Sequence, residues 1–235
     1  QQAASKRFGF HSKRTMKVAQ ELYEGVNLGP AHGGVHGVIT YMRTDSLRIS
    51  DEAAAAAEKL IKEKYGAEFY PSKRKTYKSK SGAQDAHEAI RPVSMELLPE
   101  EIRPFLTADQ YKLYKLIWDR FVASQMKNAE YDAVEVELDN VGYLFKMSES
   151  ILIFKGYRVA YSDDEDAGDK SSKLRGISEG DVLPCEEITP IQNFTEPPPH
   201  FDEASLIKFL KEKGIGRPST YAPTITTILE RGYIE

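Results

Sequence analysis

The spacing of apolar residues changes near residue 130, and this change constrains the fold more than any other feature of the chain. Within residues 111–122 apolar side chains recur every three or four positions, which is typical of an amphipathic helix. Within residues 134–138 they alternate with glutamates, which is typical of a strand with one buried face. Helical spacing returns after residue 202. The sequence therefore predicts an α+β, multidomain fold that is helical, then β, then helical.

Five segments are expected to be helical, because an apolar pattern follows a Ser, Thr or Asp that can cap a helix. The segments are residues 12–24, 50–66, 107–126, 202–213 and about 219–231, with Ser12, Ser50, Thr107 and Asp202 as caps and Ser219 or Thr220 before the last. Thr107 with Gln110 matches a capping box. In the first segment, Leu22 and Tyr23 share the apolar face with Met16 and Ala19, so all four are expected in the core.

The β region is predicted to begin with a hairpin. Asp139 and Asn140 offer the turn between residues 134–138 and 143–147. Residues 151–154 and 181–191 are expected to form further strands, and the acidic stretch 162–172 between them a flexible loop. Three prolines at 197–199 then stiffen the connection to the last helices.

Composition excludes several classes of protein. The chain has 235 residues, 40% hydrophobic and 29% charged, which is ordinary for a globular protein. No run approaches the roughly 20 apolar residues that span a membrane. The single cysteine, Cys185, excludes an internal disulfide framework and a Cys-rich zinc site. A net charge of -4 argues against a general binder of polyanions, so any field that attracts DNA must be local. The densest basic stretch, residues 71–82, is interpreted as a solvated loop, with a specific contact to DNA as the alternative.

Tyr41 and Arg43 are the first residues with an evident chemical use. They follow the apolar run that starts at Val38. On a strand, positions 41 and 43 project to the same face, so both side chains could address one phosphate. A phenol has a pKa of about 10 and is a weak nucleophile at neutral pH, so attack needs loss of its proton or neutralisation of the phosphate charge. The fixed positive charge of an arginine meets the second need.

Three segments carry a family resemblance. They are Val38-Ile39-Thr40-Tyr41-Met42-Arg43-Thr44-Asp45-Ser46, Gln84-Asp85-Ala86-His87-Glu88-Ala89-Ile90-Arg91-Pro92, and Gly214-Ile215-Gly216-Arg217-Pro218-Ser219-Thr220-Tyr221-Ala222. In this order they resemble the signature of type IA DNA topoisomerases, in the bacterial topoisomerase I branch. The resemblance extends along nearly the whole chain.

The resemblance implies catalytic roles for three residues. Tyr41 would attack single-stranded DNA and become linked to the 5′ phosphate, and Arg43 would help to position that phosphate. His87 would lie near the phosphate and add positive charge when protonated. Asp45 could orient Arg43 or cap the following turn, and Arg91 could contact DNA or pair with Glu88; the sequence leaves both questions open.

The resemblance also implies a contact with DNA in the last segment. Arg217, Ser219, Thr220 and Arg231 match residues that hold the single strand leading to the active site. Arg217 precedes a helix whose N-terminal N–H groups favour a phosphate, and two hydroxyls lie at the same point. The alternative is that Ser219 or Thr220 only caps the helix.

The family also predicts what lies outside this chain. Its members carry an N-terminal Toprim domain whose acidic residues bind Mg²⁺, and nothing here replaces that cluster; residues 163–166 are interpreted as a solvated loop. The chain begins Gln-Gln with no initiator methionine or signal peptide, so we expect an internal piece of a cytoplasmic enzyme. We expect it to bind no metal by itself, to need the Toprim domain as its partner, and to be inactive in relaxation when alone.

The resulting prediction has three domains and one activity. Residues 1–127 form a mainly helical, winged-helix-like domain carrying Tyr41, residues 128–199 a β-rich arch, and residues 200–235 the start of a helical domain that binds single-stranded DNA. The parent enzyme relaxes negatively supercoiled DNA by reversible single-strand cleavage through a 5′-phosphotyrosine, followed by strand passage, without ATP. No Walker-type phosphate loop is present, which fits ATP independence.

Three other functions are weighed against this one. In a non-catalytic DNA-binding module, Tyr41 would be packing and the last two helices would form a helix-turn-helix. A site-specific recombinase also uses a tyrosine, but it surrounds the phosphate with several arginines and histidines that this sequence lacks. A purely structural fragment would make all three motif matches accidental. Within the family, Met42 before Arg43 favours topoisomerase I over a decatenating relative.

Overall fold

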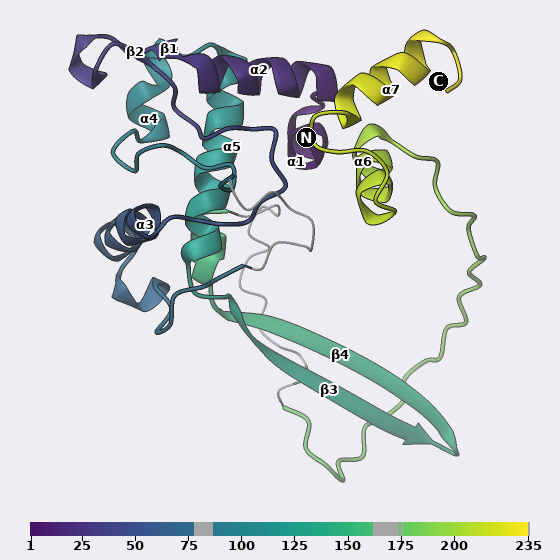
Figure 1. Cartoon of the computed structure of the whole chain (residues 1–235). Helices are drawn as coiled ribbons and strands as arrows, with labels where there is room; N and C mark the ends of the chain where they lie inside the picture. Colours follow the sequence, from purple (N-terminus) through teal and green to yellow (C-terminus); the bar gives the residue numbers. More distant parts are fainter. Residues whose placement is uncertain (78–86, 162–173, 175, 235) are drawn as a thin grey trace. The chain divides into compact units, whose positions relative to one another are not determined.

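The computed structural model describes residues 1–77, 87–161, 174 and 176–234 (Figure 1). They divide into two compact units, one made of residues 1–127 and 201–235 and the other of residues 128–200. Helices and small antiparallel sheets are both present, so the fold is mixed α and β, as predicted. The winged-helix-like and arch descriptions, and the division into three domains, stay predictions.

The first unit is built around its longest helix, α5 (Figure 1). The described α-helices of this unit are α1 (Gln2–Phe8), α2 (Ser12–Glu24), α3 (Asp51–Lys64), α4 (Pro99–Ile102), α5 (Ala108–Gln125), α6 (Glu203–Glu212) and α7 (Tyr221–Glu230). Helices α2, α3 and α4 pack against α5, whose Tyr114, Trp118 and Phe121 are buried as the apolar spacing predicts. Segments from both ends of the chain join here, because α6 packs on α1 and α7 on α2.

Most predicted helix starts are confirmed. The Ser50 side chain accepts a hydrogen bond from the backbone nitrogen of Ala53, and Thr107 and Asp202 both form capping boxes. Ser12 is an exception: the cap position of α2 is His11, with no side-chain cap, and Ser12 lies in the first turn. Its hydroxyl and backbone nitrogen donate instead to Glu203, a residue far along the chain that local sequence cannot reveal.

The prediction for Tyr23 is also wrong. Leu22 is fully buried as expected, but Tyr23 is 40% exposed. Tyr23 lies in the last turn of α2, and its ring contacts Tyr41 in the segment that follows Val38 instead of joining the core. A helical wheel cannot distinguish these two surroundings.

The segment of Tyr41 is not a strand of a sheet, and it bends at Met42 and Arg43. Strands β1 (Val26–Asn27) and β2 (Val35–His36) form a short antiparallel pair before it. Beyond them, the described part of this unit has one isolated bridge, between Ile39 and Pro92. The face that a regular strand would give to positions 41 and 43 therefore does not exist.

The short 3-10 helices among the described residues are η1 (Pro30–His32), η2 (Ala67–Phe69), η3 (Arg103–Phe105) and η4 (Gly156–Val159).

The second unit contains a long hairpin of β3 (Glu130–Asn140) and β4 (Tyr143–Phe154). The turn is Val141–Gly142 rather than the predicted Asp139–Asn140, because both turn residues have positive φ (54° and 84°) as a two-residue hairpin turn requires. Residues 151–154 continue β4 and are not a separate strand. Residues 181–191 are not a strand, since they have no pairing partner among the described residues.

The basic stretch of residues 71–82 lies only partly within the described residues. Residues 71–77 of the basic stretch are described, and there Arg74 binds Asp51 at 2.5 Å and the carbonyl oxygen of Ile49 at 3.1 Å. Arg74 is therefore a structural anchor for the start of α3. Residues 78–82 lie outside the described residues, and so does the acidic loop 162–172.

Among the described helices, none combines the length and the hydrophobicity that are needed to span a membrane.

Candidate active site

The segment that carries Tyr41 is fixed against the end of α2. The backbone nitrogen of Val38 donates to the carbonyl oxygen of Leu22 at 2.8 Å, and the Val38 carbonyl oxygen accepts from Val93 at 3.0 Å. Gly37 lies so close to α2 that a Cβ atom there would be 2.2 Å from the carbonyl oxygen of Tyr23. Only glycine permits this close approach. It lets the chain pass next to the end of α2 shortly before Tyr41.

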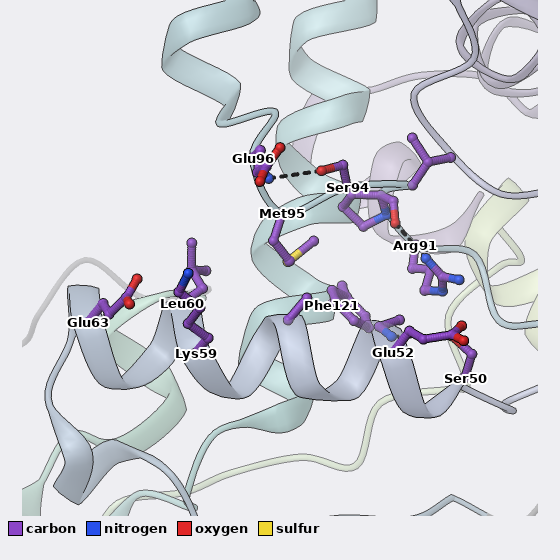
Figure 2. A pocket seen from close by; sticks show the side chains of 14 residues that line it. Ser50, Glu52, Lys59, Leu60, Glu63, Arg91, Ser94, Met95, Glu96 and Phe121 are labelled. Carbon is purple, nitrogen blue, oxygen red and sulfur yellow. Dashed lines mark hydrogen bonds between the residues drawn. The ribbon is translucent and has the colours of Figure 1, made fainter.

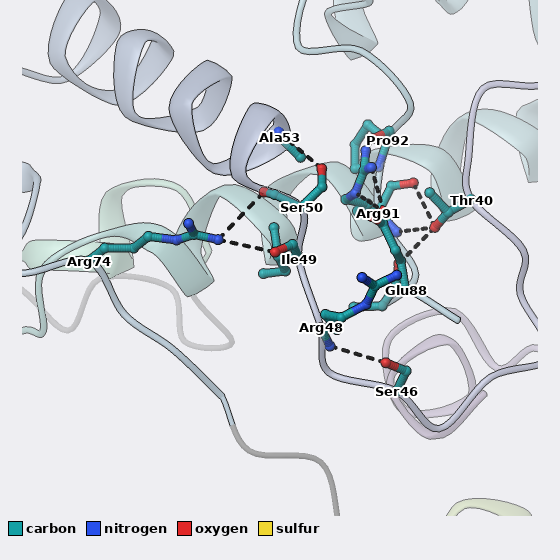
Figure 3. A network of polar contacts seen from close by, with 11 residues as sticks. Thr40, Ser46, Arg48, Ile49, Ser50, Ala53, Arg74, Glu88, Arg91 and Pro92 are labelled. Carbon is teal, nitrogen blue, oxygen red and sulfur yellow. Dashed lines mark hydrogen bonds and ion pairs between the residues drawn. The ribbon is translucent and has the colours of Figure 1, made fainter. Parts of the chain in front are cut away.

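Thr40 joins the first motif to the second (Figure 3). Its hydroxyl donates to the carbonyl oxygen of Ala89 at 2.7 Å and accepts from the backbone nitrogen of Arg91 at 2.9 Å. The backbone nitrogen of Thr40 also donates to the Arg91 carbonyl oxygen at 2.9 Å. These bonds hold residues 38–40 and 89–93 side by side, and they place His87 near Tyr41.

The ring of Tyr41 lies between two other rings. Its centroid is 5.4 Å from that of His87, at an interplanar angle of 53°, and 5.4 Å from that of Tyr23, which meets it edge-on at 68°. Tyr41 is 36% exposed. Both contacts restrain the ring while leaving part of it accessible to a ligand.

Arg43 also contacts α2. Its Nη2 atom donates to the Oε1 atom of Gln20 at 3.4 Å, and the Gln20 amide donates in turn to Glu24. Gln20 and Tyr23 are three residues apart and therefore adjacent on the helix surface. The proximity of Tyr41 and Arg43 is thus set by neighbouring residues of α2 and not by the two-residue period of a strand.

The turn after Arg43 is held by hydroxyl groups. Thr44 Oγ1 accepts from the backbone nitrogen of Ser46 at 3.0 Å, and Ser46 Oγ accepts from that of Arg48 at 3.2 Å.

Asp45 lies near Tyr221 of the third motif. Burial raises the pKa of the Tyr221 phenol, and the nearby carboxylate of Asp45 raises it further, while Arg217 lowers it. The first and third motifs therefore lie within electrostatic range of each other.

Arg91 pairs with Glu88, which decides one question that the sequence left open. The Arg91 Nη2 atom lies 2.5 Å from Glu88 Oε2, and Nη1 donates to the carbonyl oxygen of Pro92 at 2.9 Å (Figure 3). Arg91 also lines a cavity of about 470 Å³ between α3, residues 91–96 and Phe121 of α5 (Figure 2). The charged residues that line this cavity have both signs: Glu52, Glu63 and Glu96 are acidic, and Lys59 and Arg91 are basic.

The third motif forms a tight turn before α7. Thr220 occupies the N-cap position of α7, as one of the two predicted candidates, but its side chain makes no cap hydrogen bond. Its hydroxyl instead accepts from the backbone nitrogen of Arg217 at 2.8 Å and donates to the Arg217 carbonyl oxygen at 3.1 Å, inside the turn. Gly216 has φ of 80°, and a Cβ atom there would lie 3.0 Å from that hydroxyl. Arg217 and Ser219 are exposed, and Arg231 is exposed at the opposite end of α7.

A metal site does not emerge from the described residues. No group of three or more His, Cys, Asp or Glu side chains within residues 1–77, 87–161, 174 and 176–234 is arranged to hold an ion. These described residues therefore offer no site that fits Mg²⁺.

Comparison with known proteins decides the family. The profile of a family described as DNA topoisomerase matches residues 1–235. The chain belongs to the DNA topoisomerase family. It is also similar to the solved structure of full-length topoisomerase I from Thermotoga maritima, with 39% sequence identity and a TM-score of 0.78. That likeness covers 100% of this chain and 37% of the Thermotoga chain, and it supports the bacterial type IA branch that the motifs resemble.

Three residues of this topoisomerase chain were missed by sequence reasoning. Thr40 lies inside the first motif but carries no chemical signal of its own, because its role depends on a segment 49 residues away. Gln20 and Tyr23 lie before the motif, on α2. A usable signal was the polar and aromatic pair at i and i+3 in the last helical turn before the glycine-rich loop.

Proposed function

We propose that this chain supplies the nucleophile and part of the single-strand binding surface of a type IA DNA topoisomerase. In the proposed enzyme Tyr41 cleaves one strand of negatively supercoiled DNA, another strand passes through the gap, and the break is resealed without ATP. Family membership over the whole chain supports a topoisomerase function, and the finer steps are our proposal.

The observation that carries the proposal is the set of side chains around Tyr41. A partly exposed phenol lies between the rings of Tyr23 and His87, with Arg43 two residues further on and bound to the same helix as Tyr23. A tyrosine that serves only as packing has no need of a neighbouring arginine and histidine. The arrangement suits an anionic ligand next to the Tyr41 hydroxyl.

The proposed reaction is a reversible transesterification. The Tyr41 oxygen attacks the phosphorus atom and loses its proton, the bond from phosphorus to the 3′ oxygen breaks, and that oxygen leaves as a protonated 3′ hydroxyl. The product is a phosphodiester between Tyr41 and the 5′ phosphate, so the energy of the broken strand is kept for resealing. Arg43 neutralises charge on the phosphate, and His87 adds positive charge when it is protonated.

The third motif is proposed to hold the strand that leads to Tyr41. Arg217 and Ser219 are exposed at the turn before α7, and Arg231 is exposed at its far end. A helix of 10 residues is about 15 Å long, so the two arginines could contact phosphates a few nucleotides apart. Thr220 contributes by holding the turn, because both hydrogen bonds of its hydroxyl are made to the backbone of Arg217.

Other parts of the proposal concern the longer enzyme. Mg²⁺ would be bound by a Toprim domain, which would also be the partner that completes the active site, and the enzyme would work in the cytoplasm. The chain spans 37% of the Thermotoga topoisomerase I, and we propose that alone it does not relax DNA.

The test is capture of a covalent adduct. Labelled single-stranded DNA is mixed with this chain, with and without a Toprim-containing partner and Mg²⁺, and quenched with SDS. The proposal predicts label on the protein only when the partner is present, and none with Tyr41→Phe. If a mixture shown to bind DNA and to reassemble gives no adduct, Tyr41 is not the nucleophile, and the chain is a DNA-binding module.

A further inference from the structure

Helix α2 receives its N-terminal cap from another part of the chain. Its own cap residue, His11, makes no side-chain cap hydrogen bond, and its first turn contains no acidic residue. Glu203 fills both roles: its Oε2 atom accepts from the backbone nitrogen of Ser12 at 2.7 Å and from the Ser12 hydroxyl at 3.0 Å. Its Oε1 atom lies 3.4 Å from His11 Nδ1. A carboxylate here also complements the helix dipole.

Glu203 belongs to the part of the chain that carries the third motif. It is the first residue of α6, and α6 is joined to α7 by an apolar cluster of Ile207, Tyr221 and Ile225. Helix α7 in turn packs on α2. The Glu203 side chain is 18% exposed, whereas that of Ser12 is buried, so the bonds between them are largely shielded from water.

The opposite end of α2 holds the reactive segment. Gln20 binds Arg43, Tyr23 contacts Tyr41, and the carbonyl oxygen of Leu22 accepts from Val38. Gln20 lies eight residues after Ser12, which corresponds to about 12 Å along the helix. One rigid helix thus runs from the carboxylate of Glu203 to the supports of Tyr41 and Arg43.

We propose that Glu203 is a positioning residue that ties the single-strand-binding helices α6 and α7 to α2, and so orients Tyr41 and Arg43 toward the bound strand. This rests on the proposed function. Glu203 itself touches neither reacting atom. Its role is to keep the Arg217 turn between α6 and α7 in a fixed relation to the nucleophile, so that a strand held by one is presented to the other.

The test separates positioning from simple stabilisation of α2. In the full-length enzyme, single-turnover adduct formation at saturating single-stranded DNA, DNA affinity and thermal unfolding are measured for Glu203→Ala and Glu203→Gln. We expect cleavage to slow by about tenfold or more with little change in affinity, because small misplacements of reacting groups are costly. Glu212→Ala, an exposed glutamate of the same helix, is the matched control and should leave all three unchanged.

A second variant keeps the inference falsifiable. His11→Asp combined with Glu203→Ala gives α2 a cap of its own but does not restore the hydrogen bonds between α2 and α6. We expect the unfolding temperature to recover while cleavage stays slow. Recovery of both, or a normal cleavage rate in Glu203→Ala, would overturn the inference while wild-type adduct and its loss in Tyr41→Phe still support the proposed function. Absence of adduct in the wild type would overturn both.

Discussion

The Thr40 hydroxyl lies 2.7 Å from the carbonyl oxygen of Ala89, and this bond joins two segments that are 49 residues apart in sequence. Tyr41 follows Thr40 directly, and His87 lies two residues before Ala89. The bond therefore brings together the proposed nucleophile and the histidine whose ring contacts it.

Thr40→Val is expected to destabilise the chain and to separate His87 from Tyr41. Valine has the shape of threonine but leaves the Arg91 N–H and the Ala89 carbonyl without a partner, which costs about 1–3 kcal/mol. Chemical unfolding would measure the loss, and adduct formation in the full-length enzyme the functional effect. Thr40→Ser keeps the hydroxyl and should behave nearly as wild type. Equal behaviour of the valine and serine variants would contradict this account.

Gly37→Ala should be more harmful than an ordinary glycine substitution. The added methyl group would lie 2.2 Å from the Tyr23 carbonyl oxygen, so α2 and the Tyr41 segment must move apart, at a cost of about 1–3 kcal/mol or more. The control is Gly176→Ala, because a Cβ atom there meets nothing within 4 Å. Equal midpoints of denaturant unfolding for the two variants would show that the close approach is not present in solution.

Asp45→Asn is expected to lower the pKa of Tyr221. The carboxylate of Asp45 disfavours the phenolate, so removing its charge makes ionisation easier. The pKa is followed by ¹³C NMR of labelled tyrosine, with the Tyr221 signal assigned from Tyr221→Phe. Glu230→Gln, at the far end of α7, is the matched control and should leave it unchanged. An unchanged pKa in Asp45→Asn would mean that the first and third motifs do not approach each other.

Arg217→Ala should weaken single-strand binding in a salt-dependent way. Loss of one phosphate contact lowers the slope of log affinity against log salt by about 0.7 for single strands. Fluorescence titrations at several salt concentrations measure this slope. Lys213→Ala removes a nearby exposed charge whose ammonium lies over the Phe209 ring, and it serves as a comparison. A slope unaltered by Arg217→Ala would remove this residue from the proposed binding surface.

Sequence reasoning succeeded where the controlling interactions are local. Caps at Ser50, Thr107 and Asp202 involve residues three apart, and the apolar face of α5 follows from the helical period alone. It failed at Ser12 and Tyr23, whose partners Glu203 and Tyr41 lie on other segments. It also misplaced the hairpin turn by two residues, because the turn residue Val141 has a positive φ that a valine rarely adopts.

By itself, the sequence determined the helices, the change to β structure and the three motifs, because all of these are encoded in neighbouring residues. Only the tertiary structure decided how those motifs meet. Tyr41 and Arg43 were expected to share the face of a strand, whereas two adjacent residues of α2 hold them. His87 approaches Tyr41 through the backbone contacts of Thr40. Such meetings depend on packing between distant segments, which no local pattern records.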